Sequence, residues 1–289
     1  MIQFIRYRII YFTFSAIVIG IGLISVITGG LKFSIDFTGG TNLEYKLSQS
    51  ISLDKVSKIA TDLKIEGISA KINKDVLSIR AKPVDDKVEQ LFRTRLEKDL
   101  SIKVQILRIE TVGPVLGRET MIKTGIASLI AIAGILLYLA FTFKSFAFAS
   151  AAIVALVHDI FVVIGIYSLF SRFWGAEVDT LFVTALLTTM SFSVHDTIII
   201  FDKVREYKRT RGQGDMGTYL DRALSENIVR SLNNSMTIVF MLMALTLLGG
   251  SSIRFFAATL LVGTLTGTYS SPFVATPVLY IISEKFRKR

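Results

Sequence analysis

The sequence predicts a polytopic α-helical membrane protein with six transmembrane helices and a small α+β domain between the first and second helices. The chain is 51% hydrophobic and only 19% charged, whereas a soluble domain is usually about a quarter charged. No Asp, Glu, Lys or Arg occurs in 9–28, 124–143 or 255–283. A helix of about 20 apolar residues matches the hydrocarbon thickness of a bilayer. In contrast, 31–120 mixes charged and apolar residues, as a water-exposed domain does.

The first helix is expected at 9–28, so that 1–30 comprises the N-terminus and this span. Its apolar stretch is longer than the roughly 7–15 residues of a signal-peptide core, and no small-x-small cleavage site follows it. We therefore expect a retained span.

The segment 31–120 is expected to fold as a ferredoxin-like α+β domain with the order strand, helix, two strands, helix, strand. Alternation at 33–37 and 42–47 predicts strands, and Ser52 is a good N-cap for a helix. A hairpin is expected to turn at Asn73-Lys74. The second helix begins at Asp85, and the last strand holds three apolar residues. The helical stripe of the first helix comprises Val56, Ile59, Ala60 and Leu63. The expected inward residues of the second helix are Val88, Leu91, Phe92 and Leu96, and the last strand is indicated by Val104, Ile106 and Ile109.

The segment 121–283 is expected to form a bundle of five helices. Their predicted ranges are 123–143, 146–170, 180–201, 231–248 and 255–282. A polar loop at 202–230 holds a short amphipathic helix at 216–224, and a basic tail follows at 284–289. Pro272 and Pro277 are expected to bend the last helix.

The distribution of positive charge predicts the orientation. Basic residues of the N-terminus, the 202–230 loop and the tail all fall on one side of the membrane, whereas the short loops opposite contain Arg172 and Arg254. By the positive-inside rule both termini are cytoplasmic, and 31–120 is extracytoplasmic. This rule also explains the net charge of +10, so no nucleic-acid partner is expected.

The sequence gives no sign of an enzyme. The absence of cysteine excludes a disulfide framework, a cysteine zinc site and a cysteine nucleophile. No P-loop or H-E-x-x-H motif occurs. We therefore expect no catalytic residues, no metal and no cofactor, and any energy source must be a membrane gradient or a partner.

Two aspartates lie within predicted spans, and each follows one of the two histidines of the chain, in the pairs His158-Asp159 and His195-Asp196. An Asp at the centre of a membrane helix costs about 2.5–3.5 kcal/mol on translocon scales and usually faces the bundle interior. Each aspartate is either an ionisable transport group or a polar clamp between helices. Neighbouring residues point about 100° apart on a helix, so we expect His195 and Asp196 to contact different groups.

Two further features accompany these aspartates. Gly263, Gly267 and Ser271 belong to small-residue stripes of the sixth span, which favour close helix packing. Arg230, at the start of the fifth span, is either a snorkelling residue of the interface or a cation that pairs with an intramembrane carboxylate.

Six motifs resemble the SecD/SecF family of the bacterial Sec translocase. They occur in the family's order and cover nearly the whole chain. The motifs are FSIDFTGGT at 33–41, ALVHD at 155–159, SVHDTIIIFDKVRE at 193–206, RSLNNS at 230–235, LGG at 248–250 and GTYSS at 267–271. The length and the single small domain resemble the SecF branch.

The resemblance implies one half of an RND-like transporter in the bacterial inner membrane. Such a subunit pairs with a SecD-like protein and uses proton or sodium flow to promote export of unfolded preproteins through SecYEG. YajC and YidC are further partners that the resemblance implies.

The resemblance also implies roles for particular residues. The coupling aspartate of the family matches Asp196, and its arginine matches Arg230, with Asp159 as a second candidate. The family motif near the first span includes Asp36, Gly39, Gly40 and Thr41. One residue departs from the family, which usually has Asn before the coupling aspartate. Here it is His195, so the proton site is either Asp196 alone or a coupled pair. The alternative functions are a non-conducting scaffold subunit and an independent RND-type exporter of small molecules.

Overall fold

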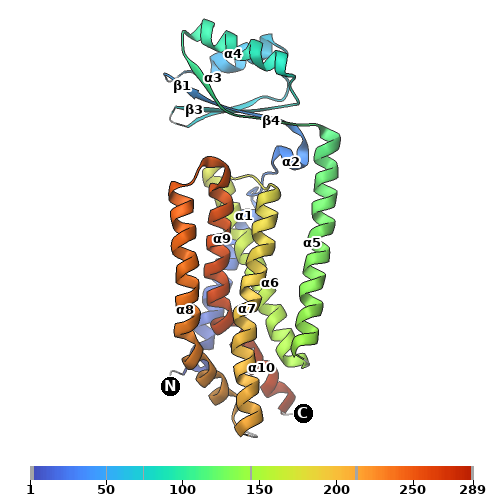
Figure 1. The fold of residues 1–289 in the computed structure, drawn as a ribbon, viewed down its shortest axis with the longest axis vertical. Coiled ribbons are helices and arrows are strands. Elements are labelled where there is room, and N and C mark those ends of the chain that lie inside the picture. The colour runs from blue at the N-terminus through green and yellow to red at the C-terminus, as the bar shows by residue number, and fades with distance from the viewer. Residues whose placement is uncertain (1–2, 50, 74, 144, 212–213, 288–289) are drawn as a thin grey trace. The chain divides into compact units, whose positions relative to one another are not determined.

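The computed structural model describes residues 3–49, 51–73, 75–143, 145–211 and 214–287. They form two compact units, Phe33–Ile126 and the combination of Met1–Lys32 with Ala127–Arg289 (Figure 1). The sequence placed the end of the domain near 120. The division instead falls inside one continuous helix, α5 (Pro114–Phe143).

The first unit opens with a helical turn where the sequence predicted a strand. Ser34 caps α2 (Ile35–Thr38), and its hydroxyl accepts a hydrogen bond of 3.1 Å from the Asp36 amide. The expectation of a strand at 33–37 was wrong because alternation over five residues is too short to distinguish a strand from a helical turn.

The strand and helix order that follows agrees with the prediction. The elements are β1 (Gly40–Leu47), α3 (Leu53–Asp62), β2 (Ser69–Asn73), β3 (Val76–Ala81), α4 (Asp86–Leu100) and β4 (Val104–Val112). The sheet order is β2-β3-β1-β4, and all neighbouring strands are antiparallel. Ser52 caps α3 as expected. The predicted turn at Asn73-Lys74 includes residue 74, which lies outside the described residues.

The core of this unit lies between the sheet and the two helices, and includes Leu43, Tyr45, Leu77 and Phe92. Leu91, which the sequence placed inward, is 57% exposed. The buried face of α4 is instead formed by Glu89, Phe92 and Leu96. A leucine beside a phenylalanine satisfies the helical pattern equally well, and a buried glutamate is not expected from hydropathy.

The second unit is a helical bundle. Its elements are η1 (Ile5–Tyr7), α1 (Arg8–Ile27), the second part of α5, α6 (Phe146–Trp174), α7 (Thr180–Arg211), α8 (Met216–Leu248), α9 (Ser251–Ser270), the π-helical η2 (Ser271–Ala275) and α10 (Thr276–Arg287). The start of α1 and the end of α10 lie at the same end of the bundle (Figure 1).

Five helices in the described residues are long and apolar enough to cross a membrane. They correspond to the first five predicted spans. The sixth predicted span, 255–282, is instead divided into α9, η2 and α10. Pro272 lies in η2, where the missing N–H of proline interrupts the regular hydrogen-bond ladder.

The predicted loop at 202–230 is largely helical. Helix α7 continues to Arg211, and α8 begins at Met216, so the amphipathic segment 216–224 forms the first turns of α8. The two extensions pack together: the rings of Tyr207 and Tyr219 stack with centroids 6.4 Å apart, and the Tyr207 hydroxyl donates to Glu226. This pairing explains why a polar stretch stays helical outside an apolar span.

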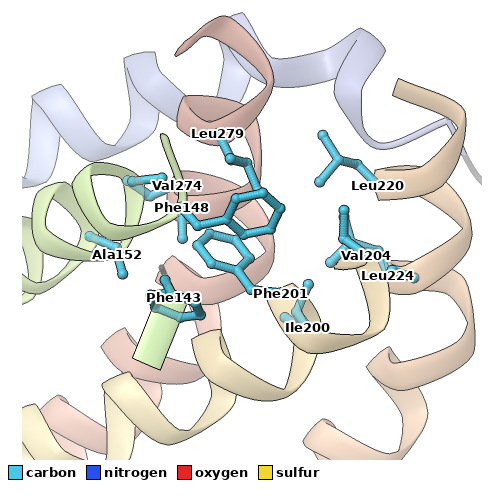
Figure 2. Packing of buried hydrophobic residues seen from close by; sticks show 14 of the residues in the cluster. Phe143, Phe148, Ala152, Ile200, Phe201, Val204, Leu220, Leu224, Val274 and Leu279 are labelled. Atoms are coloured by element: carbon cyan, nitrogen blue, oxygen red, sulfur yellow. The ribbon is translucent and has the colours of Figure 1, made fainter. Parts of the chain in front are cut away.

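An aromatic cluster holds the adjoining part of the bundle together. Figure 2 shows Phe143, Phe148 and Phe201 in contact, with Val274 and Leu279 beside them. The Phe201 ring lies 5.4 Å from the rings of both Phe143 and Phe148, centroid to centroid. These residues come from α5, α6 and α7, so the cluster anchors the end of α5 to the bundle.

Glycine permits two close helix crossings. A Cβ on Gly22 of α1 would lie 2.7 Å from the Gly165 Cα of α6, and a Cβ on Gly263 of α9 would lie 2.3 Å from the Thr189 Cβ of α7. Helices α1 and α6, and helices α7 and α9, therefore approach within a distance that side chains on these residues would prevent.

Candidate functional site

Asp159 of α6 lies at the centre of a buried polar cluster. The residue is 4% exposed. The Oδ2 atom accepts hydrogen bonds from Ser193 of α7 and, at 2.7 Å, from Ser270 of α9. The Oδ1 atom lies 2.8 Å from the Nδ1 of His158. The carboxyl group is therefore bonded to groups of three helices.

His158 extends this cluster to the first helix. Its Nε2 lies 3.0 Å from the Ser15 hydroxyl of α1, and Ser15 lies 3.3 Å from the Tyr269 hydroxyl of α9. Tyr269 donates to the backbone carbonyl of Tyr11 at 2.9 Å. The cluster thus links α1, α6, α7 and α9.

The small residues predicted to pack helices bring these groups together. A Cβ on Gly267 would lie 3.1 Å from the Ser193 Cβ, so α9 lies directly against α7 at Ser193. The Ser271 hydroxyl is 2.9 Å from that of Thr197. Gly263, Gly267 and Ser271 all lie on the face of α9 and η2 that contacts α7.

Asp196 has a different environment from Asp159. It is half-buried on α7, and its Oδ2 accepts a 2.7 Å hydrogen bond from Ser231 of α8. It faces a cavity of about 20 Å³, which is room for one water molecule. The cavity is lined by Phe192, His195, Asp196, Asn234, Ser235, Ile238, Thr264, Gly267 and Thr268.

His195 is exposed and lines this cavity together with a second, more open one of about 410 Å³ between α5 and α7. The second cavity includes Tyr138 and Ser191. His195 and Asp196 therefore share the small cavity, but the hydrogen bond of Asp196 is to α8.

Arg230 lies next to the Asp196 site without pairing with it. It precedes Ser231, is exposed, and donates a 2.8 Å hydrogen bond to the Asn227 side chain. Within the described residues no ion pair joins Arg230 to Asp196. Arg230 lies on α8 and Asp196 on α7, and Ser231, the residue after Arg230, donates to the Asp196 carboxylate.

The motif residues 36–41 belong to the other unit and form a tight backbone junction. Gly39 and Gly40 have φ angles of 71° and 133°, which favour glycine. A Cβ on Gly39 would lie 2.7 Å from the Pro114 Cα. The Thr41 hydroxyl accepts from the Val84 amide at 2.8 Å and lies 3.0 Å from that of Thr111. Asp36 lies on α2, and its backbone amide donates the hydrogen bond that the Ser34 side chain accepts as N-cap.

Ser15 and Tyr269 are site residues that the sequence reasoning did not identify. Ser15 is a polar residue within an uncharged span, and it is 6% exposed. Its burial was the missing information, because one hydroxyl in a membrane helix gives no pattern. Among the described residues, no three His, Cys, Asp or Glu side chains cluster as metal ligands would.

Comparison with known proteins agrees with this architecture. Residues 92–285 match the family described as "Protein export membrane protein SecD/SecF, C-terminal", and 24–51 match the "SecD/SecF GG Motif". The protein translocase subunit SecF of Thermobaculum terrenum is 34% identical, over 96% of this chain and 93% of its own. SecF of Vibrio alginolyticus is also 34% identical, over 95% of this chain and 88% of its own.

Solved structures show the same fold. SecDF, a translocon-associated membrane protein from Thermus thermophilus, has a TM-score of 0.85 and 27% identity. SecDF in a super-membrane-facing form has a TM-score of 0.68. Each match covers 99% of this chain but 39% of the SecDF chain, so this chain spans well under half of that longer protein.

The long apolar helices and the polar cluster between them define an integral membrane protein, and its relatives place it among proteins of protein transport. The chain belongs to the SecF family of protein translocase subunits. The family resemblance in the sequence motifs is thereby confirmed.

Proposed function

We propose that this chain is the SecF-type subunit of a Sec translocase. With a SecD-like partner it uses the proton or sodium motive force to promote export of unfolded preproteins through SecYEG, with YajC and YidC as further partners. The names of its relatives support this role. The match to SecDF also supports this role. It covers 39% of the SecDF chain, so the longer protein has a further part that can correspond to a SecD-like half.

The observation that carries this proposal is the contrast between the two intramembrane aspartates. Asp159 is 4% exposed and bonded to three side chains. Asp196 is half-buried, has one hydroxyl partner and faces a cavity of about 20 Å³. A carboxylate that exchanges an ion needs access to water and few fixed partners. Asp196 is therefore the coupling group, and Asp159 is a polar clamp.

Arg230 modulates Asp196 in this mechanism, and His195 lines the same small cavity. Ser231 follows Arg230 on α8 and donates a hydrogen bond to the Asp196 carboxylate. A rotation of α8 therefore changes the distance between this carboxylate and the Arg230 guanidinium. An approaching guanidinium favours the ionised carboxylate. Loss of an ion from Asp196 and movement of α8 are then coupled.

The proposal also includes the topology of the chain in the membrane. In this proposal α9, η2 and α10 together make a sixth crossing, so that both termini lie on one side of the bacterial inner membrane, and the positive-inside rule makes that side cytoplasmic. The domain is extracytoplasmic and ferredoxin-like, and its antiparallel order β2-β3-β1-β4 supports that assignment. Asp36, Gly39, Gly40 and Thr41 lie at the start of this unit, where a Cβ on Gly39 would meet Pro114 of the same unit.

The test is Asp196→Asn, with Asp202→Asn as the matched control. Asp202 lies on the same helix, and its side chain is 56% exposed beside Arg205. In vesicles carrying SecYEG and the SecD-like partner, Asp196→Asn should abolish the stimulation of export by an ion gradient. Asp202→Asn should retain it. Full stimulation in the Asp196→Asn vesicles would refute the coupling role.

A scaffold function is the second candidate, and the Asp159 cluster favours it because the cluster holds four helices together. A scaffold predicts that substitutions at Asp196 reduce co-purification of the SecD-like partner. The coupling role predicts intact complexes that lack only the response to the gradient.

A further inference from the structure

The hydrogen bonds around His158 form a continuous chain across three helices. Four links join five groups. The distances are 2.8 Å from Asp159 Oδ1 to His158 Nδ1, 3.0 Å from His158 Nε2 to Ser15 Oγ, 3.3 Å from Ser15 Oγ to Tyr269 Oη, and 2.9 Å from Tyr269 Oη to the Tyr11 carbonyl. Ser15 and His158 are both buried.

Each of these links requires one proton. A carboxylate and a backbone carbonyl supply none, and the Ser15 and Tyr269 hydroxyls supply one each. A neutral imidazole supplies one more, which gives three protons for four links. An imidazolium supplies two, which gives four protons. With Asp159 ionised, the number of protons equals the number of links only when both ring nitrogens of His158 are protonated.

The direction of the bonds shows which link depends on the extra proton. With an imidazolium, Nδ1–H donates to Asp159, Nε2–H donates to Ser15, Ser15 donates to Tyr269, and Tyr269 donates to Tyr11. With a neutral ring that donates to Asp159, Ser15 must donate to Nε2. The Ser15 and Tyr269 oxygens then face each other with no proton between them, because Tyr269 is committed to Tyr11.

The charges near the imidazole favour the imidazolium over a protonated Asp159. Ser193 and Ser270 both donate to Asp159 Oδ2, and donors of this kind favour the ionised carboxyl group. The other groups that face the ring are Ser15 of α1 and Tyr269 of α9, whose ring centroid is 6.2 Å away. In the described part of the chain no Lys, Arg or second carboxylate contacts the cluster. Either arrangement leaves the His158–Asp159 pair without net charge in an apolar bundle, where a lone carboxylate is costly, and the two serine donors to Oδ2 favour the imidazolium.

We propose that His158 is a proton-binding site, occupied as an imidazolium by Asp159, and that its second proton completes the hydrogen-bonded connection between α1 and α9. Loss of that proton removes the Ser15–Tyr269 bond and loosens α1 from the bundle. This site is separate from the Asp196 cavity, and the inference does not depend on the proposed transport function.

The experiment uses the full chain in lipid nanodiscs with ¹⁵N-labelled histidine. The chain has two histidines, so His195→Gln leaves His158 as the single source of ring signals. We expect both ring nitrogens to have the chemical shifts of an imidazolium at pH 7.5. A neutral ring of either tautomer at this pH would overturn the proposal. Should the His195→Gln chain fail to fold, the wild-type chain must show an imidazolium signal that is lost in His158→Gln.

Two variants test the origin of the proton. Asp159→Asn should leave His158 neutral at pH 7.5, because its counter-charge is gone. Tyr269→Phe removes the last two links, so a neutral ring and Ser15 supply enough protons for the two that remain. The imidazolium fraction at pH 7.5 should therefore fall. An unchanged fraction in either variant would contradict the proton count on which the inference is based.

Discussion

At the scale of single residues, the chain solves the problem of two carboxylates in an apolar bundle in two ways. Asp159 is enclosed by donors from three helices, whereas Asp196 keeps one hydroxyl partner and a small cavity. The sequence presents both as His-Asp pairs at similar depths. Their difference arises from the groups that lie opposite: Ser193 of α7 and Ser270 of α9 donate to Asp159, whereas Ser231 of α8 donates to Asp196.

The clamp role of Asp159 makes a prediction for Ser270→Ala. Loss of the 2.7 Å bond to Asp159 should lower the free energy of unfolding by about 1 kcal/mol, the usual size of a bond between membrane helices. Thr184→Ala is the control, because the Thr184 hydroxyl donates to the Thr180 carbonyl of its own helix. Unfolding in mixed detergent micelles measures both. Equal stabilities would contradict the clamp.

The sequence predicted the candidate residues better than their contacts. The small-residue stripes of the sixth span identified Gly263, Gly267 and Ser271 as packing residues. The partners of each residue depend on helix rotation, which a single sequence does not determine. His158 and Asp159 bond each other although neighbouring residues point apart on a helix, because an imidazole is long enough to reach the adjacent carboxylate at 2.8 Å.

At the scale of elements, glycine contacts determine how closely α7 and α9 approach. A Cβ on Gly263 would lie 2.3 Å from the Thr189 Cβ. Gly263→Ala should therefore separate the helices and lower the free energy of unfolding by about 1–3 kcal/mol, as overpacking does. Gly125→Ala is the control, since nothing lies within 4 Å of a Cβ there. A Gly263→Ala chain as stable as the control would show that the crossing is not tight.

The domain core contains an ionisable pair that predicts a pH dependence. Burial, and then the hydrogen bond to Glu89, raise the pKa of Tyr45 above its ordinary value of 10.0. Below pH 10 Tyr45 is neutral in both the folded and unfolded states, so its stabilising contribution is complete. Above pH 10 the unfolded tyrosine ionises first, and the domain should lose up to about 1.4 kcal/mol per pH unit.

Hydrogen exchange of the β1 and β3 amides in the full chain, between pH 9 and 11, measures this loss after correction for the intrinsic rate. Tyr45→Phe lacks the phenol and should show a smaller decline over the same range. The same decline in both chains would assign the effect to other groups.

The element order was predictable because each strand and helix of the domain has a clear period. The boundaries of the helices in the bundle were less predictable. The extensions of α7 and α8 are polar and are stabilised by contacts between Tyr207, Tyr219 and Glu226, which hydropathy does not detect. The break at η2 was visible as Pro272, but a proline predicts a bend without predicting a π-helical segment.

At the scale of the whole molecule, the orientation of the chain in the membrane is open to a direct test, because the chain has no cysteine. Lys87→Cys places one thiol in the exposed part of α4, and Arg209→Cys places one near the end of α7. A membrane-impermeant maleimide should label Lys87→Cys in intact spheroplasts and Arg209→Cys only after lysis. Labelling of Arg209→Cys in intact spheroplasts would reverse the proposed topology.

The unbroken length of α7 has a mechanical consequence. Its 32 residues extend about 48 Å at 1.5 Å per residue, against a hydrocarbon layer of about 30 Å. Roughly 18 Å of stiff rod therefore protrudes from the layer. A tilt of about 10° within the bilayer would displace the tip of such a rod by about 3 Å. In this way ion exchange at an intramembrane carboxylate can move the part of α7 that lies in water while the helix itself stays rigid.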